Sequence, residues 1–216
     1  MRRGSPGTHN RPGGIICLAV LACLAASIQG CSGKGGTLEI ESVGLRPVSL
    51  EAEFEHGWYM ENQADASFFF STAPLDMLLG DEGFDGQFVH VQLLWKPRPG
   101  RTPIDRWASN ISIRYVVLSG DQIGIYGGSG FAWIGGKPGD KSMRLSIKDS
   151  RLSLLESTDG FQDLLSPASI SGTVRARLDT IKSLRIRRAM SQIVTDALGQ
   201  TRWVDRGRST AAQQPG

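Results

Sequence analysis

The chain is poor in cysteine, and all three of its cysteines fall within the first 31 of 216 residues. Residues 32–216 contain no thiol, so this part of the chain cannot form an internal disulfide bond. A body of this length is expected to form one domain, with or without a small appendage, that a hydrophobic core holds together.

The sequence also lacks the short motifs that mark common catalytic and metal sites. Only His56 and His90 follow residue 31, and neither belongs to an HxH or HExxH pattern of zinc ligands. No GxSxG elbow of a serine hydrolase occurs, and the glycine-rich residues 124–136 lack the GxxxxGK[ST] signature of a phosphate-binding loop. We therefore assign no catalytic, cofactor-binding or metal-ligating residue, and we expect both histidines to be structural.

No apolar stretch is long enough to cross a bilayer as a helix, which takes about 20 residues. The most apolar one, residues 15–28, is shorter; it follows Arg2, Arg3 and Arg11 and is preceded by no acidic residue. A positive front, a short apolar middle and a small-residue exit are typical of a secretory signal peptide.

The exit of this segment, Ile28-Gln29-Gly30-Cys31, resembles the lipobox of bacterial lipoproteins. Gln29 departs from the usual pattern, which has Ala, Ser or Thr at that position. The resemblance implies cleavage after Gly30 and acylation of Cys31, first on its thiol and then on its new amine. It covers about residues 1–31 and implies nothing about the fold beyond them. An ordinary cleaved signal, an apolar N-terminus that is no signal at all, and a cleavage at Cys23 remain alternatives.

This resemblance also predicts where the protein works. Two or three acyl chains hold a protein on a membrane far better than one chain does. In lipoproteins of this class an Asp after the acylated cysteine often signals retention in the inner membrane, so Ser32 favours the outer membrane, facing the periplasm. The expected partners are the membrane, through the acyl chains on Cys31, and an envelope protein or lipid.

Charge is balanced overall but not along the chain. Removing Arg2, Arg3 and Arg11 from the 24 basic residues leaves 21, which equals the 21 acidic residues. A neutral body gives no support to nucleic-acid binding, which needs a basic face. Residues 31–100 hold 4 basic and 11 acidic groups, whereas residues 172–216 hold 9 and 3. Either the two ends neutralise each other in the fold, or the C-terminal part presents a basic face to anionic lipid or polysaccharide.

Period-two patterns predict a mainly β body: an antiparallel sandwich or barrel. Glycine-rich turns separate short strands, and long helices between them are lacking. Short helical pieces are expected at residues 74–79 and 159–165. The expected strands cover residues 38–43, 48–55, 66–72, 88–95, 111–118, 123–126, 131–134, 142–148, 151–156 and 168–178.

Apolar residues at helical spacing predict a C-terminal α-helix over residues 183–198, with Gly199 as its stop. The cations Lys182, Arg185, Arg187 and Arg188 stand at its front, where they oppose the helix dipole, so we expect another group to compensate them. The predicted organisation is a signal peptide (1–30), a lipidated Cys with a flexible tether (31–36), a β-rich domain (37–178), a helical segment (179–204) and a disordered tail (205–216).

Two further groups of residues are candidates for binding. Asp81, Glu82 and Asp85 offer the oxygen ligands that Ca²⁺ prefers, but their spacing differs from that of an EF-hand, so we expect a solvated turn. Aromatic side chains at the rim of a sandwich can bind sugars or partners, although most are expected to pack in the core or at edges. The side chains expected to be most exposed are Trp58, Tyr59 and Trp107.

These observations favour a lipid-anchored envelope protein that acts as a non-catalytic structural or interaction module at the membrane surface. The first alternative is a binding module for a lipid or other apolar ligand, which needs a deep apolar cavity. The second is a hydrolase of an envelope polymer, which needs converging titratable groups.

Overall fold

The computed structural model describes Met1 and residues 35–61, 65–80, 85–97 and 109–200. The predicted signal peptide, the predicted acylation site Cys31 with Gly30, and the predicted tail lie outside these residues. The same holds for Asp81, Glu82 and Trp107.

The described body is mainly β, as predicted, with a C-terminal helix. Its strands form one large sheet in which nearly all neighbours are antiparallel. The strands are β1 (Gly36–Ser42), β2 (Ser49–Phe54), β3 (His56–Glu61), β4 (Ala66–Ser71), β5 (Gly86–Leu93), β6 (Ile111–Ser119), β7 (Gln122–Gly135), β8 (Ser142–Ser157) and β9 (Ala168–Leu178). The helices are α1 (Leu75–Leu78) and α2 (Thr180–Leu198).

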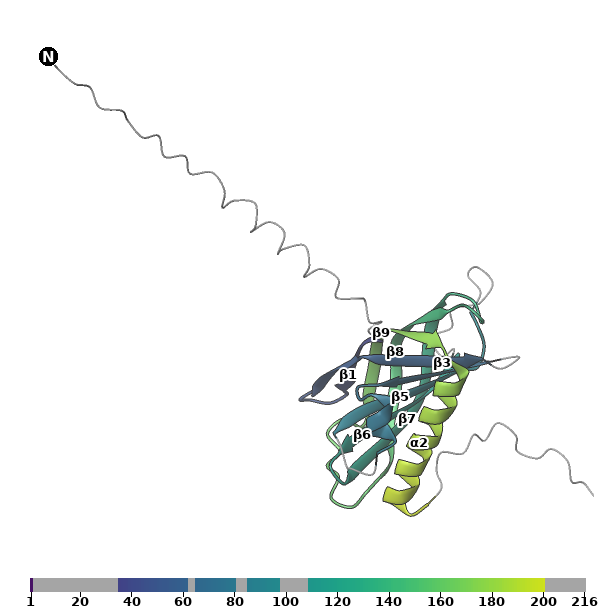
Figure 1. The fold of residues 1–216 in the computed structure, drawn as a ribbon. Coiled ribbons are helices and arrows are strands. Elements are labelled where there is room, and N and C mark those ends of the chain that lie inside the picture. The colour runs from purple at the N-terminus through teal and green to yellow at the C-terminus, as the bar shows by residue number, and fades with distance from the viewer. Residues whose placement is uncertain (2–34, 62–64, 81–84, 98–108, 201–216) are drawn as a thin grey trace, which may run out of the picture. The chain divides into compact units, whose positions relative to one another are not determined.

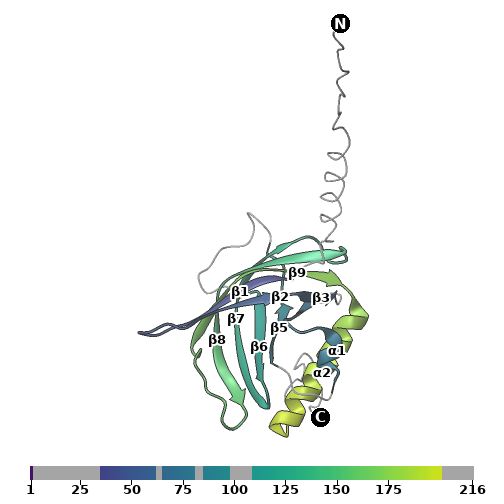
Figure 2. The same cartoon turned by 60° about the vertical axis from the view of Figure 1, so that its left-hand side comes forward.

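The last strand, β9, closes the sheet into a ring (Figures 1 and 2). On one side it pairs with β8, and on the other its first residues pair with β1. Its end pairs in parallel with β3, through Trp58 opposite Arg177 and Tyr59 opposite Leu178. Strands β3 to β9 are thereby closed on themselves, which is the barrel form of the two predicted architectures. The β1–β2 hairpin branches from this ring.

The inside of the ring is filled with large side chains. Because side chains alternate along a strand, one face of each strand points inward. Tyr115 and Tyr126 are buried there, and their hydroxyls donate hydrogen bonds to Gln87 Oε1 at 2.8 Å and to Asp163 Oδ1 at 2.9 Å. Other members of this cluster include Leu38, Ile40, Phe54, Tyr59, Phe68, Phe70, Val89, Val91, Ile113, Leu145, Ile170 and Val174.

Helix α2 packs on the opposite, outer face of the sheet. Helical spacing places Ile186, Met190 and Val194 on one side of α2, where all three are completely buried. They belong to a second apolar cluster that includes Phe69 and Phe88. The helix begins after Asp179, whose carboxylate caps Lys182 N at 2.9 Å, and ends at Gly199 in the left-handed conformation, as predicted.

Four sequence predictions were wrong. Strand β3 was missed, because the sequence around Gly57 lacks clear alternation. Strand β7 runs unbroken through the glycines that were expected to form a turn. These glycines serve packing instead: β8 lies so close that a Cβ at Gly128 would meet the backbone of Arg151. Strand β8 is also continuous: Asp149 forms a register shift with a positive φ rather than a turn. No helix forms over residues 159–165.

The side chain of Asn110 is fully buried and links the residue before β6 to strand β7. It accepts a hydrogen bond from Ala132 N at 2.8 Å and donates one to Ala132 O at 2.9 Å. We predict that Asn110→Ala lowers the free energy of unfolding by about 3 kcal/mol, because it leaves buried backbone groups unsatisfied. Urea unfolding followed by circular dichroism measures this. As a control, substitution of the exposed residue Ser129 by Ala should change the free energy of unfolding by less than about 0.5 kcal/mol. An equally small effect of Asn110→Ala would contradict the prediction.

His90 lies beneath α2 and stacks on Phe69, with ring centroids 4.7 Å apart. Burial, and to a lesser extent the charges of Arg114 and Arg187, lower the pKa of His90 from 6.5 to about 3. His90 therefore binds a proton below about pH 6.5 in the unfolded chain, but only below about pH 3 in the folded protein. Stability is lost over this window as the pH falls, by about 1.4 kcal/mol per unit.

We predict that His90→Leu reduces the loss of unfolding free energy between pH 7.5 and pH 4.5 by about 2.7 kcal/mol. Urea titrations at the two pH values measure the difference. His90→Gln, which is also uncharged, should show the same reduced pH slope even if its absolute stability differs. An unchanged slope in both variants would contradict the assignment.

Candidate functional site

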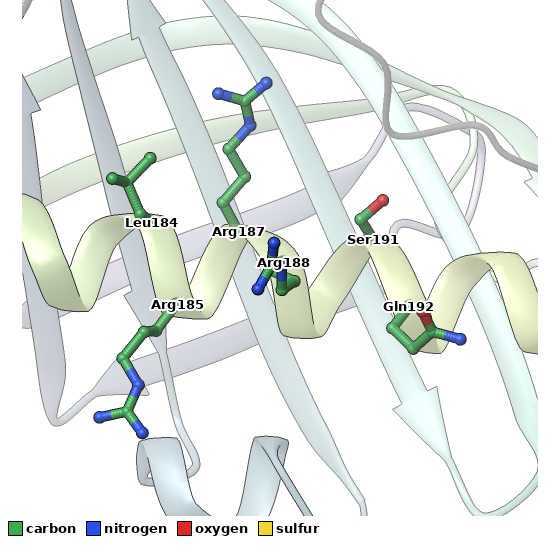
Figure 3. A pocket seen from close by; sticks show the side chains of 6 residues that line it. All are labelled: Leu184, Arg185, Arg187, Arg188, Ser191 and Gln192. Atoms are coloured by element: carbon green, nitrogen blue, oxygen red, sulfur yellow. The ribbon is translucent and has the colours of Figure 1, made fainter.

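The outer face of α2 carries a shallow hollow of about 570 Å³ that is lined by cations (Figure 3). We call this surface the α2 outer face. Its described lining consists of Leu184, Arg185, Arg187, Arg188, Ser191 and Gln192.

The arrangement follows from the way α2 is packed. Ile186, Ala189 and Met190 are buried against the sheet, so helical spacing turns Arg185 and Arg188 to solvent. Both are fixed on a helix whose inner side is anchored to a rigid sheet, and their positions along the surface are therefore well defined.

The three arginines do not converge on one point. Figure 3 shows the side chains of Arg185 and Arg187 leaving opposite sides of the helix, with Arg188 between them. Arg187 is half-buried, and its charge contributes to the lowered pKa of His90. A single small anion needs converging donors, so this fan of guanidinium groups suits an extended anionic surface better.

The expected compensation of the cations at the start of α2 is present for one of them. Lys182 Nζ lies 3.7 Å from Asp179 Oδ2, and Asp179 also caps the helix. Within the described part of the chain, Arg185 and Arg188 form no ion pair. Within the described residues, no acidic side chain therefore neutralises these two charges.

Two aliphatic side chains share this face with the cations. Ile181 is 73% exposed and Leu184 is 49% exposed. Exposed aliphatic groups among Lys and Arg are the pattern of helices that lie on an anionic membrane surface. The sequence analysis identified the cations but missed these two residues. Ile181 lies before residue 183, where the helix was expected to begin, and Leu184 lies within the expected helix but was not recognised as exposed. The helical period of Ile181, Leu184 and Arg188 is the signal that could have found them.

The other candidate residues are dispersed. His56 stacks on Trp58 at 5.6 Å, on a strand distant in sequence from His90. The Asp85 carboxylate accepts a hydrogen bond from Gly120 N at 2.8 Å and so braces the turn between β6 and β7. No group of three or more His, Cys, Asp or Glu side chains able to hold a metal ion occurs among the described residues.

The predicted exposure of Trp58 and Tyr59 was wrong. Tyr59 is fully buried inside the ring, where its hydroxyl donates to the carbonyl of Asp140. Trp58 packs against the cluster under α2. Missing strand β3 caused this error, because the two side chains point to the two packed faces of that strand.

The largest side chains that the structure describes inside the ring are closely packed. Phe54, Tyr59, Phe68, Phe70 and Tyr115 each expose 0% of their surface, so none borders a void that admits a water molecule. The titratable groups Tyr115 and Tyr126 in this interior have a raised pKa, mainly because burial disfavours their charged forms. This is the behaviour of packed core tyrosines.

Among the described residues, no helix has the length and apolar character needed to cross a membrane. Comparison of the chain with family models, curated protein sequences and solved structures finds no match.

Proposed function

We propose that the protein is a lipid-anchored, non-catalytic interaction module at the membrane surface, and that its α2 outer face contacts anionic lipid headgroups. The observation that carries this proposal is the combination of exposed Ile181 and Leu184 with Arg185 and Arg188, which form no ion pair within the described residues.

Electrostatics favours this contact. A Lys or Arg near an anionic bilayer gains about 1 kcal/mol, and the gain falls off within a Debye length. Arginine also binds phosphate through two parallel hydrogen bonds. A fan of guanidinium groups can reach several headgroups at once, while the aliphatic side chains between them enter the interfacial layer.

The proposed anchor would keep the body close to the bilayer. Cleavage before Cys31 leaves only residues 31–35 between the acyl chains and the first strand, and five residues span at most about 17 Å. A weak lipid contact then becomes effective, because the tether makes it an intramolecular step.

The two alternatives receive less support from the described residues. An apolar carrier needs an open cavity, and the ring interior is packed. An enzyme needs converging titratable groups with displaced pKa values. The displaced groups that the structure describes, Tyr59, His90, Tyr115 and Tyr126, owe their shifts mainly to burial and do not line the α2 hollow.

The anchor is tested by metabolic labelling. In bacterial cells fed radiolabelled palmitate, we predict that the wild-type protein takes up label and that Cys31→Ser abolishes labelling. Cys23→Ser is the matched control and should be labelled normally. An unlabelled wild-type protein, or loss of label in Cys23→Ser alone, would contradict acylation at Cys31.

The contact of the α2 outer face is tested on lipidated protein in vesicles. We predict that a polarity-sensitive fluorophore attached at Ile181→Cys shifts its emission to the blue with phosphatidylglycerol vesicles but not with neutral phosphatidylcholine vesicles. Adding Arg185→Gln and Arg188→Gln should weaken the contact by about 2 kcal/mol, and high salt should weaken it further.

The matched control for that experiment removes two other exposed cations, with Lys148→Gln and Arg151→Gln on β8. This pair makes the same change in net charge and should leave the blue shift unchanged. An emission that does not depend on lipid charge, or equal effects of the two pairs, would refute the contact.

A further inference from the structure

Strand β2 is the terminal strand of the sheet. It pairs with β1 from Glu41 opposite Ser49 to Gly36 opposite Phe54, and no other described strand pairs with it. Figure 2 shows the β1–β2 hairpin projecting beyond the ring. The outer edge of β2 is thus a row of backbone groups with which no other described strand pairs.

The register identifies which backbone groups face outward. Ser42 N donates to Val48 O at 2.9 Å, so these two residues form a hydrogen-bonded pair. In an antiparallel ladder such pairs alternate with pairs whose N–H and C=O groups point away from the partner strand. The N–H and C=O groups of Ser49, Glu51 and Glu53 therefore point to the outer edge.

The solvent face of the hairpin is acidic. Glu39 lies directly opposite Glu51, and Glu41 and Glu53 continue the same exposed face. Like charges directly opposite each other destabilise a strand pair. Glu39 also accepts a hydrogen bond from Ser49 Oγ at 3.1 Å, but this contact does not neutralise its charge opposite Glu51. A strand with Lys or Arg at alternate positions would relieve the repulsion.

The tip of the hairpin exposes three aliphatic side chains beside the cation Arg46. Val43 is 66% exposed, Val48 is 42% exposed, and Leu45 is completely exposed. Charged residues alone would suffice to protect an edge strand from unwanted pairing. Exposed aliphatic side chains at the end of the same edge work against such protection, but they supply apolar surface that a docked segment would bury.

We infer that the outer edge of β2 is a docking site for an extended basic segment of a partner protein. The segment would add a strand beside β2 and form backbone hydrogen bonds with Ser49, Glu51 and Glu53. Its basic side chains would lie beside the carboxylates, and its apolar side chains would continue the inner face towards Val48 and Leu45.

A second copy of the chain fits this edge poorly. Two-fold antiparallel pairing that keeps the inner faces aligned sets residues of like parity opposite each other. The registers that pair the most residues place Glu51 opposite Glu51, or Glu51 opposite Glu53. The repulsion disfavours self-pairing and selects a partner of opposite charge.

This site is separate from the α2 outer face, and its chemistry does not depend on lipid contact. Only the expectation that the partner lies in the cell envelope rests on the proposed function. Binding measured in detergent micelles, without anionic lipid, therefore distinguishes failure of the docking site from failure of the membrane contact.

The test uses the full chain in neutral detergent and a short peptide that alternates Lys and Val. We expect the peptide to bind and to slow hydrogen exchange at the amides of Ser49, Glu51 and Glu53, whereas a peptide with Glu in place of Lys should not. Glu51→Pro removes an outward N–H without breaking a bond to β1, because proline is tolerated on an edge strand. It should weaken binding at least about tenfold.

Glu51→Gln is the matched control that keeps the N–H and removes the charge, and it should weaken binding less than Glu51→Pro does. Unchanged circular dichroism and melting temperature would confirm that both variants fold. If Glu51→Pro unfolds, protection of the three amides in the wild-type protein decides the question. Absence of peptide binding, binding without that protection, or a wild-type dimer that protects the same amides would overturn the inference.

Discussion

The pairing of β9 on both of its sides is the constraint on which the rest of the structure depends. On one side β9 is bonded to β8, and on the other to β1 and to the middle of β3. This closes the ring of β3 to β9, buries the inner side chains and leaves β2, beyond β1, as the terminal strand of the sheet. Because α2 begins directly after β9, the same strand also fixes where the helix starts.

Two surfaces of opposite charge follow from this arrangement. The acidic half of the sequence contributes the hairpin, and the basic C-terminal part contributes the α2 outer face. The hypothesis that the two charged ends simply neutralise each other receives little support at these two places, since Arg185 and Arg188 form no ion pair among the described residues. We propose instead that each surface serves a different partner: anionic lipid for the helix and a basic strand for the hairpin.

Much of the fold could be predicted from local patterns, because alternation and helical spacing act over a few residues. Residues 66–72, 111–118 and 168–178 carry strong alternation or apolar runs and are strands, and Gly199 ends α2 as expected. Closure could not be predicted, because it depends on Trp58 of β3 pairing with Arg177 of β9, which lies more than half of the chain further along. The glycines of β7 indicated turns, but close approach of β8 accounts for them. For the candidate site, the cations were evident in the sequence, whereas the exposure of Ile181 and Leu184 depends on which side of α2 packs.

The central claim is that the body is held at a membrane with its α2 outer face towards anionic headgroups and its hairpin free for a partner. Nuclear magnetic resonance of the lipidated protein in nanodiscs that contain headgroup-spin-labelled anionic lipid tests it most directly. The account predicts that signals of Ile181, Leu184 and Arg188 are broadened most and that those of Val43 and Leu45 are broadened least. Uniform broadening, or strongest broadening at the hairpin tip, would contradict it.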